Sequence, residues 1–61
     1  MKYVLERNVW DRWIIVHPEH RHLAWSGSQW VPHVRGVGTI AQISNFDTRD
    51  EADDAARRQV G

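Results

Sequence analysis

The sequence predicts an α+β protein, in which a small antiparallel β-sheet of four or five strands, largely a meander, carries one C-terminal α-helix on one face. Three observations favour this class. A hairpin pattern spans 22–32, a continuously apolar, mostly β-branched run occupies 13–16, and a helix-capping pattern begins at Thr48. At 61 residues the chain is expected to form a single domain, 1–61, near the lower size limit for independent folding.

The hairpin at 22–32 is the stretch whose local chemistry most narrowly prescribes a shape. Its arms, about 22–26 and 29–32, are rich in strand-favouring residues and flank Ser-Gly-Ser, in which Gly27 accepts the positive φ of a tight turn. Pro32 has no N–H for a sheet ladder, so it ends the second arm or confines it to a sheet edge.

Three further strands are predicted around this hairpin. Residues 2–6 alternate between two faces, and 10–16 contain the run Trp-Ile-Ile-Val, which is typical of a central strand covered on both sides. Pro18 indicates a turn before the hairpin. After a glycine-containing loop at 33–38, a short last strand is expected at 39–43.

The clearest helix signal lies at 48–60. Thr48 and Glu51 match a capping box, in which the threonine hydroxyl accepts a hydrogen bond from the amide of Glu51. A helix here has two different faces. The inner face is mostly alanine and comprises Ala52, Ala55, Ala56, Gln59 and Val60, and the opposite face comprises Asp50, Asp53, Asp54, Arg57 and Arg58.

The core is predicted to consist of the indole side chains. The chain has no cysteine, so neither a disulfide nor a thiolate metal site adds stability. An alanine-lined helix approaches a sheet closely, so the sheet must supply the volume, and one tryptophan buries roughly 150–250 Å². The four tryptophans are Trp10, Trp13, Trp25 and Trp30.

Charge and hydropathy set limits on the partners. Eight basic and eight acidic residues give a formal net charge of zero, so no global field draws the chain onto nucleic acid or an anionic membrane. No apolar run approaches the roughly 20 residues of a membrane span, and the N-terminal residues become charged before a signal-peptide core develops. We expect a cytoplasmic protein.

The histidines are the candidate metal ligands. His17, His20 and His22 would surround one ion, with Glu19 as a carboxylate ligand, if their loop curled. Their spacing is not that of an established zinc finger, and a solvated, proton-sensitive turn is the simpler interpretation. We therefore expect no metal and no cofactor.

Catalytic groups are sparse in this sequence. There is no cysteine nucleophile, and the serines fall in turns, where hydroxyls usually bond to nearby backbone. A triad of Ser26 or Ser28 with a histidine and Asp11 would need a water-excluding pocket, which so small a domain rarely encloses. We expect a protein that is not an enzyme.

Two surfaces are candidates for binding. One is the acidic start of the helix, where Asp47, Asp50, Glu51, Asp53 and Asp54 with only Arg49 among them give a local charge of −4. Such a patch would meet a basic surface on a partner protein; the alternative is ordinary helix capping and solubility. The other is a nucleic-acid surface, on which bases would stack and phosphates would bind, made of Trp10, Arg12, Trp30, His33 and Arg35.

A pattern-level resemblance covers most of the chain. The hairpin LAWSGSQW followed by NFDTRDEADDAARR resembles short open reading frames of phages and mobile elements, in which an aromatic-rich small sheet precedes an F-x-T-x-x-E-A-type helix start. Small size, few catalytic groups and an acidic helix also resemble anti-CRISPR and related anti-defence proteins. That resemblance implies action on a larger host complex in the host cytoplasm, and it assigns no individual residue.

These observations predict a small non-catalytic protein-binding module, of the kind a phage uses to inhibit a host defence complex by steric or electrostatic occlusion. The predicted partner-binding residues are Asp50, Asp53, Asp54, Trp30, His33 and Arg35. A nucleic-acid-binding module using Trp and Arg on the sheet face is the alternative. Homodimerisation, with a second copy covering a strand edge or a surplus tryptophan, is a third possibility.

Overall fold

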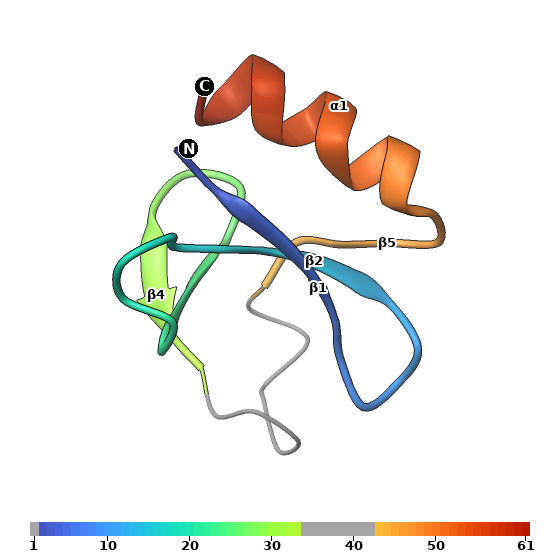
Figure 1. Ribbon diagram of the computed structural model, residues 1–61, viewed down its shortest axis with the longest axis horizontal. Helices are drawn as coiled ribbons and strands as arrows, with labels where there is room; N and C mark the ends of the chain where they lie inside the picture. The colour runs from blue at the N-terminus through green and yellow to red at the C-terminus, as the bar shows by residue number, and fades with distance from the viewer. Residues whose placement is uncertain (1, 34–42) are drawn as a thin grey trace.

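The computed structural model describes residues 2–33 and 43–61, and it confirms the α+β class. Helix α1 (Arg49–Gln59) is the last element of the chain and packs against β1, β2 and β5 (Figure 1). The sheet is antiparallel, with a β1-β2-β3-β4 meander to which β5 is added through β2. The strands are β1 (Val4–Arg7), β2 (Trp13–Val16), β3 (Leu23–Trp25), β4 (Trp30–Pro32) and β5 (Asn45–Phe46).

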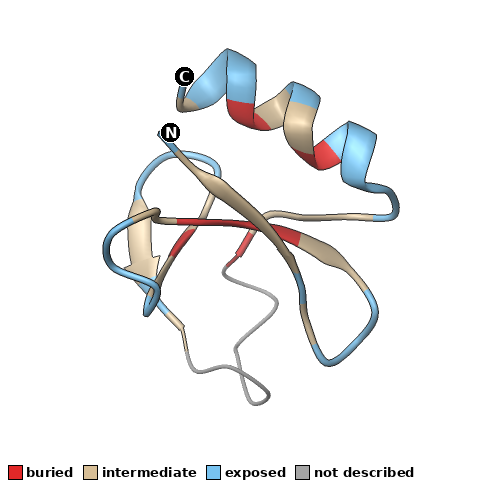
Figure 2. Ribbon diagram, viewed as in Figure 1, coloured by how far each residue is buried: buried red, intermediate tan, exposed pale blue. Residues whose placement is uncertain are grey.

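Strand β2 is the centre of the sheet. It pairs with β1 along one side, and its other side is shared by β5 at Trp13 and Ile14 and by β3 at Val16. Ile14, Ile15 and Val16 are at most 4% exposed (Figure 2). Because successive side chains of a strand face opposite sides, both faces of β2 are covered, as the apolar run predicts.

One face of β2 belongs to an aliphatic cluster. Ile14 and Val16 pack there with Ala24 of β3 and Ile43, and Val31 of β4 lies against them. The cluster therefore joins the meander to the residue that leads into β5, which fixes the start of the C-terminal segment on the sheet.

The other face of β2 carries Ile15, which points the opposite way from its two neighbours and lies on the side that α1 covers. The helix buries Ala52 and Ala56 completely, so the predicted alanine stripe is the packed face. At its start the Thr48 hydroxyl accepts from the amide of Glu51 at 3.2 Å, which confirms the predicted cap.

The prediction that the tryptophans form the core is wrong. Trp13, Trp25 and Trp30 are only half-buried, Trp10 is exposed, and the buried side chains of the described residues are all aliphatic. On the face of β2 that α1 covers, the fully buried residues are Ile15, Ala52 and Ala56, so small aliphatic side chains and not indoles are enclosed there. The helix packs mainly on β1, β2 and β5, so the indoles of β3 and β4 lie beside it.

Two strand boundaries also differ from the prediction. Of the strand expected at 39–43, residues 39–42 lie outside the described residues and Ile43 is not in a strand; the next described strand, β5, begins two residues further on. The strand expected at 10–16 begins only at Trp13, because residues 8–12 form the turn between β1 and β2.

Candidate functional site

Two adjacent apolar residues are exposed between β1 and β2. Val9 is 60% exposed and Trp10 is 49% exposed, and they are the exposed large hydrophobic residues of the part of the chain that the structure describes. We refer to Val9 and Trp10 together as the hairpin tip. A contiguous apolar surface on so small a chain is a candidate contact site.

The backbone beneath the hairpin tip is held by hydrogen bonds on both sides. The amide of Asn8 donates to the carbonyl of Arg12 at 2.9 Å, and the amide of Asp11 donates to the carbonyl of Asn8 at 3.1 Å. Asp11 has φ 63°, so the loop is a tight turn closed by a left-handed residue, a common three-residue hairpin connection. The Asn8 side-chain oxygen also accepts from the amides of Trp10 and Arg12, each at 3.0 Å.

Side chains brace the base of this turn. The Arg7 guanidinium forms an ion pair with the Asp11 carboxylate. Arg12 donates from Nε to the side-chain oxygen of Asn45 at 2.9 Å and forms an ion pair with Asp47. The turn is thus joined both to its own strand and to the segment that leads into α1, so the hairpin tip stands on a well-supported base.

A second candidate surface is the aromatic cluster, which we define as Trp25, Trp30, His17, His20 and His22. The two indoles contact edge-on with ring centroids 5.2 Å apart, and His17 lies 5.0 Å from Trp30. The ring centroid of His20 lies 4.9 Å from that of His17 and 6.0 Å from that of His22. Trp25 also donates from Nε1 to the Gln59 side chain at 2.8 Å, which links the cluster to the end of α1.

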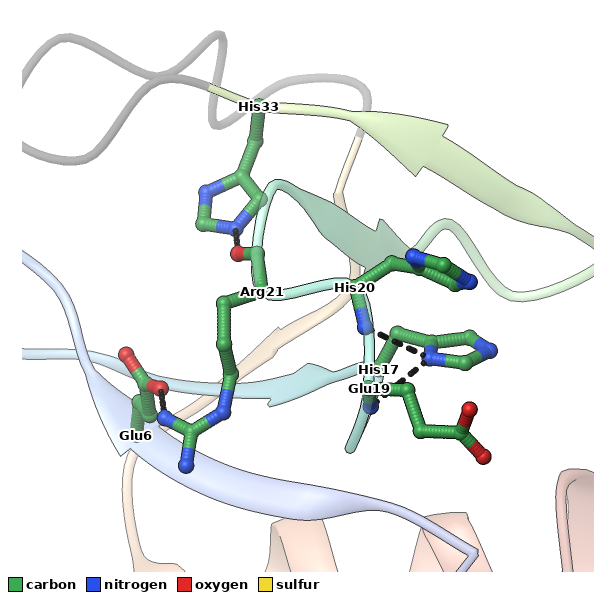
Figure 3. A network of polar contacts seen from close by, with 6 residues as sticks. All are labelled: Glu6, His17, Glu19, His20, Arg21 and His33. Atoms are coloured by element: carbon green, nitrogen blue, oxygen red, sulfur yellow. Dashed lines mark hydrogen bonds and ion pairs between the residues drawn. The ribbon is translucent and has the colours of Figure 1, made fainter.

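His17 has a structural role in the turn after β2. Its Nδ1 accepts hydrogen bonds from the amides of Glu19, at 3.1 Å, and His20, at 3.0 Å (Figure 3). That nitrogen is therefore engaged as an acceptor and is not directed at an ion. Among residues 2–33 and 43–61, no three histidine, aspartate or glutamate side chains are arranged to hold a metal ion.

The three predicted aspartates of the helix do not form one open acidic face. Asp53 accepts from the Tyr3 hydroxyl at 2.6 Å and pairs with Arg57 at 3.1 Å, so it is turned toward the N-terminal end of the sheet. Asp54 pairs with Arg58 at 2.8 Å, and Asp50 is exposed in the first turn. Paired arginines offset much of the local charge of −4 that the sequence indicates.

The remaining predicted residues lie elsewhere. Trp30 belongs to the aromatic cluster, and His33 lies within 3.1 Å of the Arg21 carbonyl through its Nε2 (Figure 3). Arg35 is outside the described residues. Figure 1 shows α1 and the end of β4 on well-separated parts of the molecule, so the predicted set is not brought together. Of the hairpin tip, only Trp10 was named from the sequence, as part of the nucleic-acid surface, and Val9 was not, although Asn8 and Asp11, both turn-favouring residues, flank the two.

Tyr3 provides a pH-dependent prediction. Its hydrogen bond to Asp53, and then its partial desolvation, raise the pKa of Tyr3 above the ordinary value of 10.0. The folded chain therefore holds the tyrosine proton more strongly than the unfolded chain, and this contribution to stability is lost as pH rises above about 10. We expect a steeper fall in unfolding free energy as pH rises above about 10 in the wild type than in Tyr3→Phe.

The measurement is denaturant unfolding across that range, together with absorbance titration of the tyrosine, which is unambiguous because the chain has only one. Identical pH profiles for the wild type and Tyr3→Phe would show that the Tyr3–Asp53 contact does not persist in solution.

Comparison of the chain with known proteins gives no match. No protein-family model matches it, and neither a curated protein nor a solved structure matches it. In the part of the chain that the structure describes, no helix has the length and apolar character needed to cross a membrane. The class that the fold and the site define is a small α+β protein with a braced apolar hairpin tip.

Proposed function

We propose that the chain is a non-catalytic protein-binding module that covers a surface of a larger protein, with the hairpin tip as its anchor. The observation that carries this proposal is the exposure of Val9 and Trp10 on a turn held by Asn8 and Asp11. Tryptophan is enriched among the residues that dominate protein–protein affinity, and a preorganised loop loses little conformational entropy on binding.

The surroundings of the hairpin tip indicate the chemistry of the partner. Arg7, Asp11, Arg12 and Asp47 form ion pairs beside it, so an apolar centre is bordered by a polar and nearly neutral rim. Stable protein interfaces have the same arrangement. The partner would offer an apolar pocket with a margin of mixed charge, and an inhibitor of this design would act by steric occlusion more than by electrostatic attraction.

The arginines support a protein partner over nucleic acid. Arg7, Arg12 and Arg21 each pair with a carboxylate, so a phosphate would have to compete with an existing ion pair at each of them. The guanidinium carbon of Arg7 also lies 5.8 Å from the centroid of the Trp13 ring. A cation from the same chain therefore occupies that face of the ring. Stacking of bases would require open rings beside unpaired cations.

The test is partner capture with matched variants. Affinity purification from the cells that encode the chain identifies the retained protein, and calorimetry then measures its Kd. Trp10→Ala is expected to raise Kd about 30-fold or more, because central tryptophans contribute about 2 kcal/mol or more. Gln29→Ala, at an exposed position in the other hairpin turn, is the control and should leave Kd unchanged.

Denaturant unfolding of Trp10→Ala checks that a loss of binding is not a loss of fold, since an exposed side chain should change stability by less than about 0.5 kcal/mol. Full affinity in Trp10→Ala would contradict the anchor. Salt-dependent binding of a single-stranded oligonucleotide, with no protein retained, would contradict the proposed function and favour the nucleic-acid alternative.

A further inference from the structure

The outer edge of β1 is a second surface, separate from the hairpin tip. The hydrogen bond from the Asn8 amide to the Arg12 carbonyl fixes the pattern of the ladder between β1 and β2. Counting back from Asn8 in steps of two, the backbone groups of Glu6 and Val4 point toward β2. The backbone N–H and C=O groups of Tyr3, Leu5 and Arg7 consequently point away from β2. Among the described strands β1 lies at an end of the sheet, so we call these three sets of backbone groups the β1 edge.

The usual protection of an edge strand is weak here. Natural edges are blunted by proline, by bulges or by charged side chains that repel a second strand. β1 has the sequence VLER, without proline, and its register with β2 is regular. Glu6 forms an ion pair with Arg21 at 2.7 Å and its side chain is only 13% exposed, and Arg7 pairs with Asp11 (Figure 3 shows the first pair). Both charges are therefore offset within the chain.

We propose that the β1 edge pairs with the β1 edge of a second copy, antiparallel and about a two-fold axis at Leu5. Leu5 then lies opposite Leu5 of the other copy, and Tyr3 lies opposite Arg7 of the other copy. In this register, each residue whose backbone N–H and C=O point outward faces another such residue, so the two can form hydrogen bonds. On the other side of the ribbon Val4 lies opposite Glu6. The strand is self-complementary in this register, because no like charges are opposed.

Neighbouring registers are less favourable. Centring the pair on Glu6 would place two carboxylates directly opposite each other, and centring it on Arg7 would oppose two guanidinium groups. Centring it on Val4 would shorten the ladder by one residue at each end. The register at Leu5 therefore pairs the most backbone groups at the lowest electrostatic cost.

This dimer has a defined consequence for the hairpin tips. Each tip begins two residues after Arg7, the last residue of β1. Since the two β1 strands run in opposite directions, the two tips lie at opposite ends of the paired strands, and the assembly presents two anchors.

Amide hydrogen exchange, read by NMR at low and high protein concentration, tests the pairing residue by residue. The amides of Leu5 and Arg7 should exchange about fivefold more slowly once the total protein concentration is about ten times the dimer Kd, and rapidly on dilution. The amide of Glu6, which points toward β2, and the amide of Asn8, which bonds to the Arg12 carbonyl, should be protected at both concentrations. Sedimentation equilibrium on the same samples gives the mass.

A pair of variants tests the register. Val4→Glu and Val4→Lys remove the same apolar side chain. In the dimer, Val4→Glu places a like charge opposite Glu6 of the other copy, and Val4→Lys places an opposite charge there. By symmetry, each pair occurs twice in the dimer. We expect the dimer of Val4→Glu to be about tenfold weaker than that of Val4→Lys, because each dimer contains two such cross-strand pairs and both change from repulsive to attractive between the variants.

Three results would overturn the proposal. They are a monomeric mass at every concentration, a dimer in which exchange at Leu5 and Arg7 does not depend on concentration, and equal dimer affinity in the two Val4 variants. Each of these measurements leaves the role of Trp10 untouched, so this proposal and the proposed function fail independently.

Discussion

Ile15→Ala is expected to lower the free energy of unfolding by about 2–5 kcal/mol, the usual cost of truncating a fully buried isoleucine to alanine. Ile15 is 0% exposed and lies between β2 and the alanine stripe of α1, so its removal leaves a cavity that the short helix cannot easily fill. A chain of 61 residues has about 3–9 kcal/mol of stability in total. The variant should therefore lie close to its unfolding transition.

Urea denaturation followed by circular dichroism measures this change, and Val9→Ala is the matched control. Val9 is also β-branched and apolar but is 60% exposed, so its truncation should cost less than about 0.5 kcal/mol. Equal losses in the two variants would mean that the face of β2 toward α1 is not packed as described.

Ala56→Leu is expected to destabilise the fold by about 1–3 kcal/mol, because the added side chain has no space between α1 and the sheet. Ala56 is fully buried, and the close approach of the helix depends on its small size. Leucine forms helices almost as readily as alanine, so helix propensity does not account for the loss.

Arg58→Leu is the control for that change, since it places the same side chain on the exposed face of the same helix and removes only a surface ion pair with Asp54, worth about 0.3–0.5 kcal/mol. Chemical denaturation of both variants supplies the comparison. A neutral or stabilising Ala56→Leu would show that the helix does not sit tightly on β2.

The elements that were predictable from the sequence are those whose signal is local. The run at 13–16 identifies the central strand because four consecutive apolar residues leave no exposed face. Thr48 identifies the helix start because the cap lies within three residues of its partner. Gly27 has φ 107°, as the predicted turn requires.

The elements that were not predictable depend on contacts between distant parts of the chain. The burial of each tryptophan is set by where α1 lies on the sheet, and residue spacing does not encode that placement. Asp53 was assigned to an open face because the helical period groups it with Asp50; its partner Tyr3 is 50 residues away in sequence. The exposure of Trp10 likewise follows from a turn that starts the second strand three residues later than expected.

The contacts of Arg12 with Asn45 and Asp47 join the first hairpin to the segment that immediately precedes α1. If that helix were destabilised, Arg12 would lose these contacts and the turn that carries Trp10 would be held less firmly. This would happen although no side chain of the helix contacts the binding partner at the hairpin tip. In a mutational scan scored by binding, substitutions at buried helix positions would therefore weaken binding, as substitutions of the contact residues do. Only a parallel measurement of unfolding would separate the two groups.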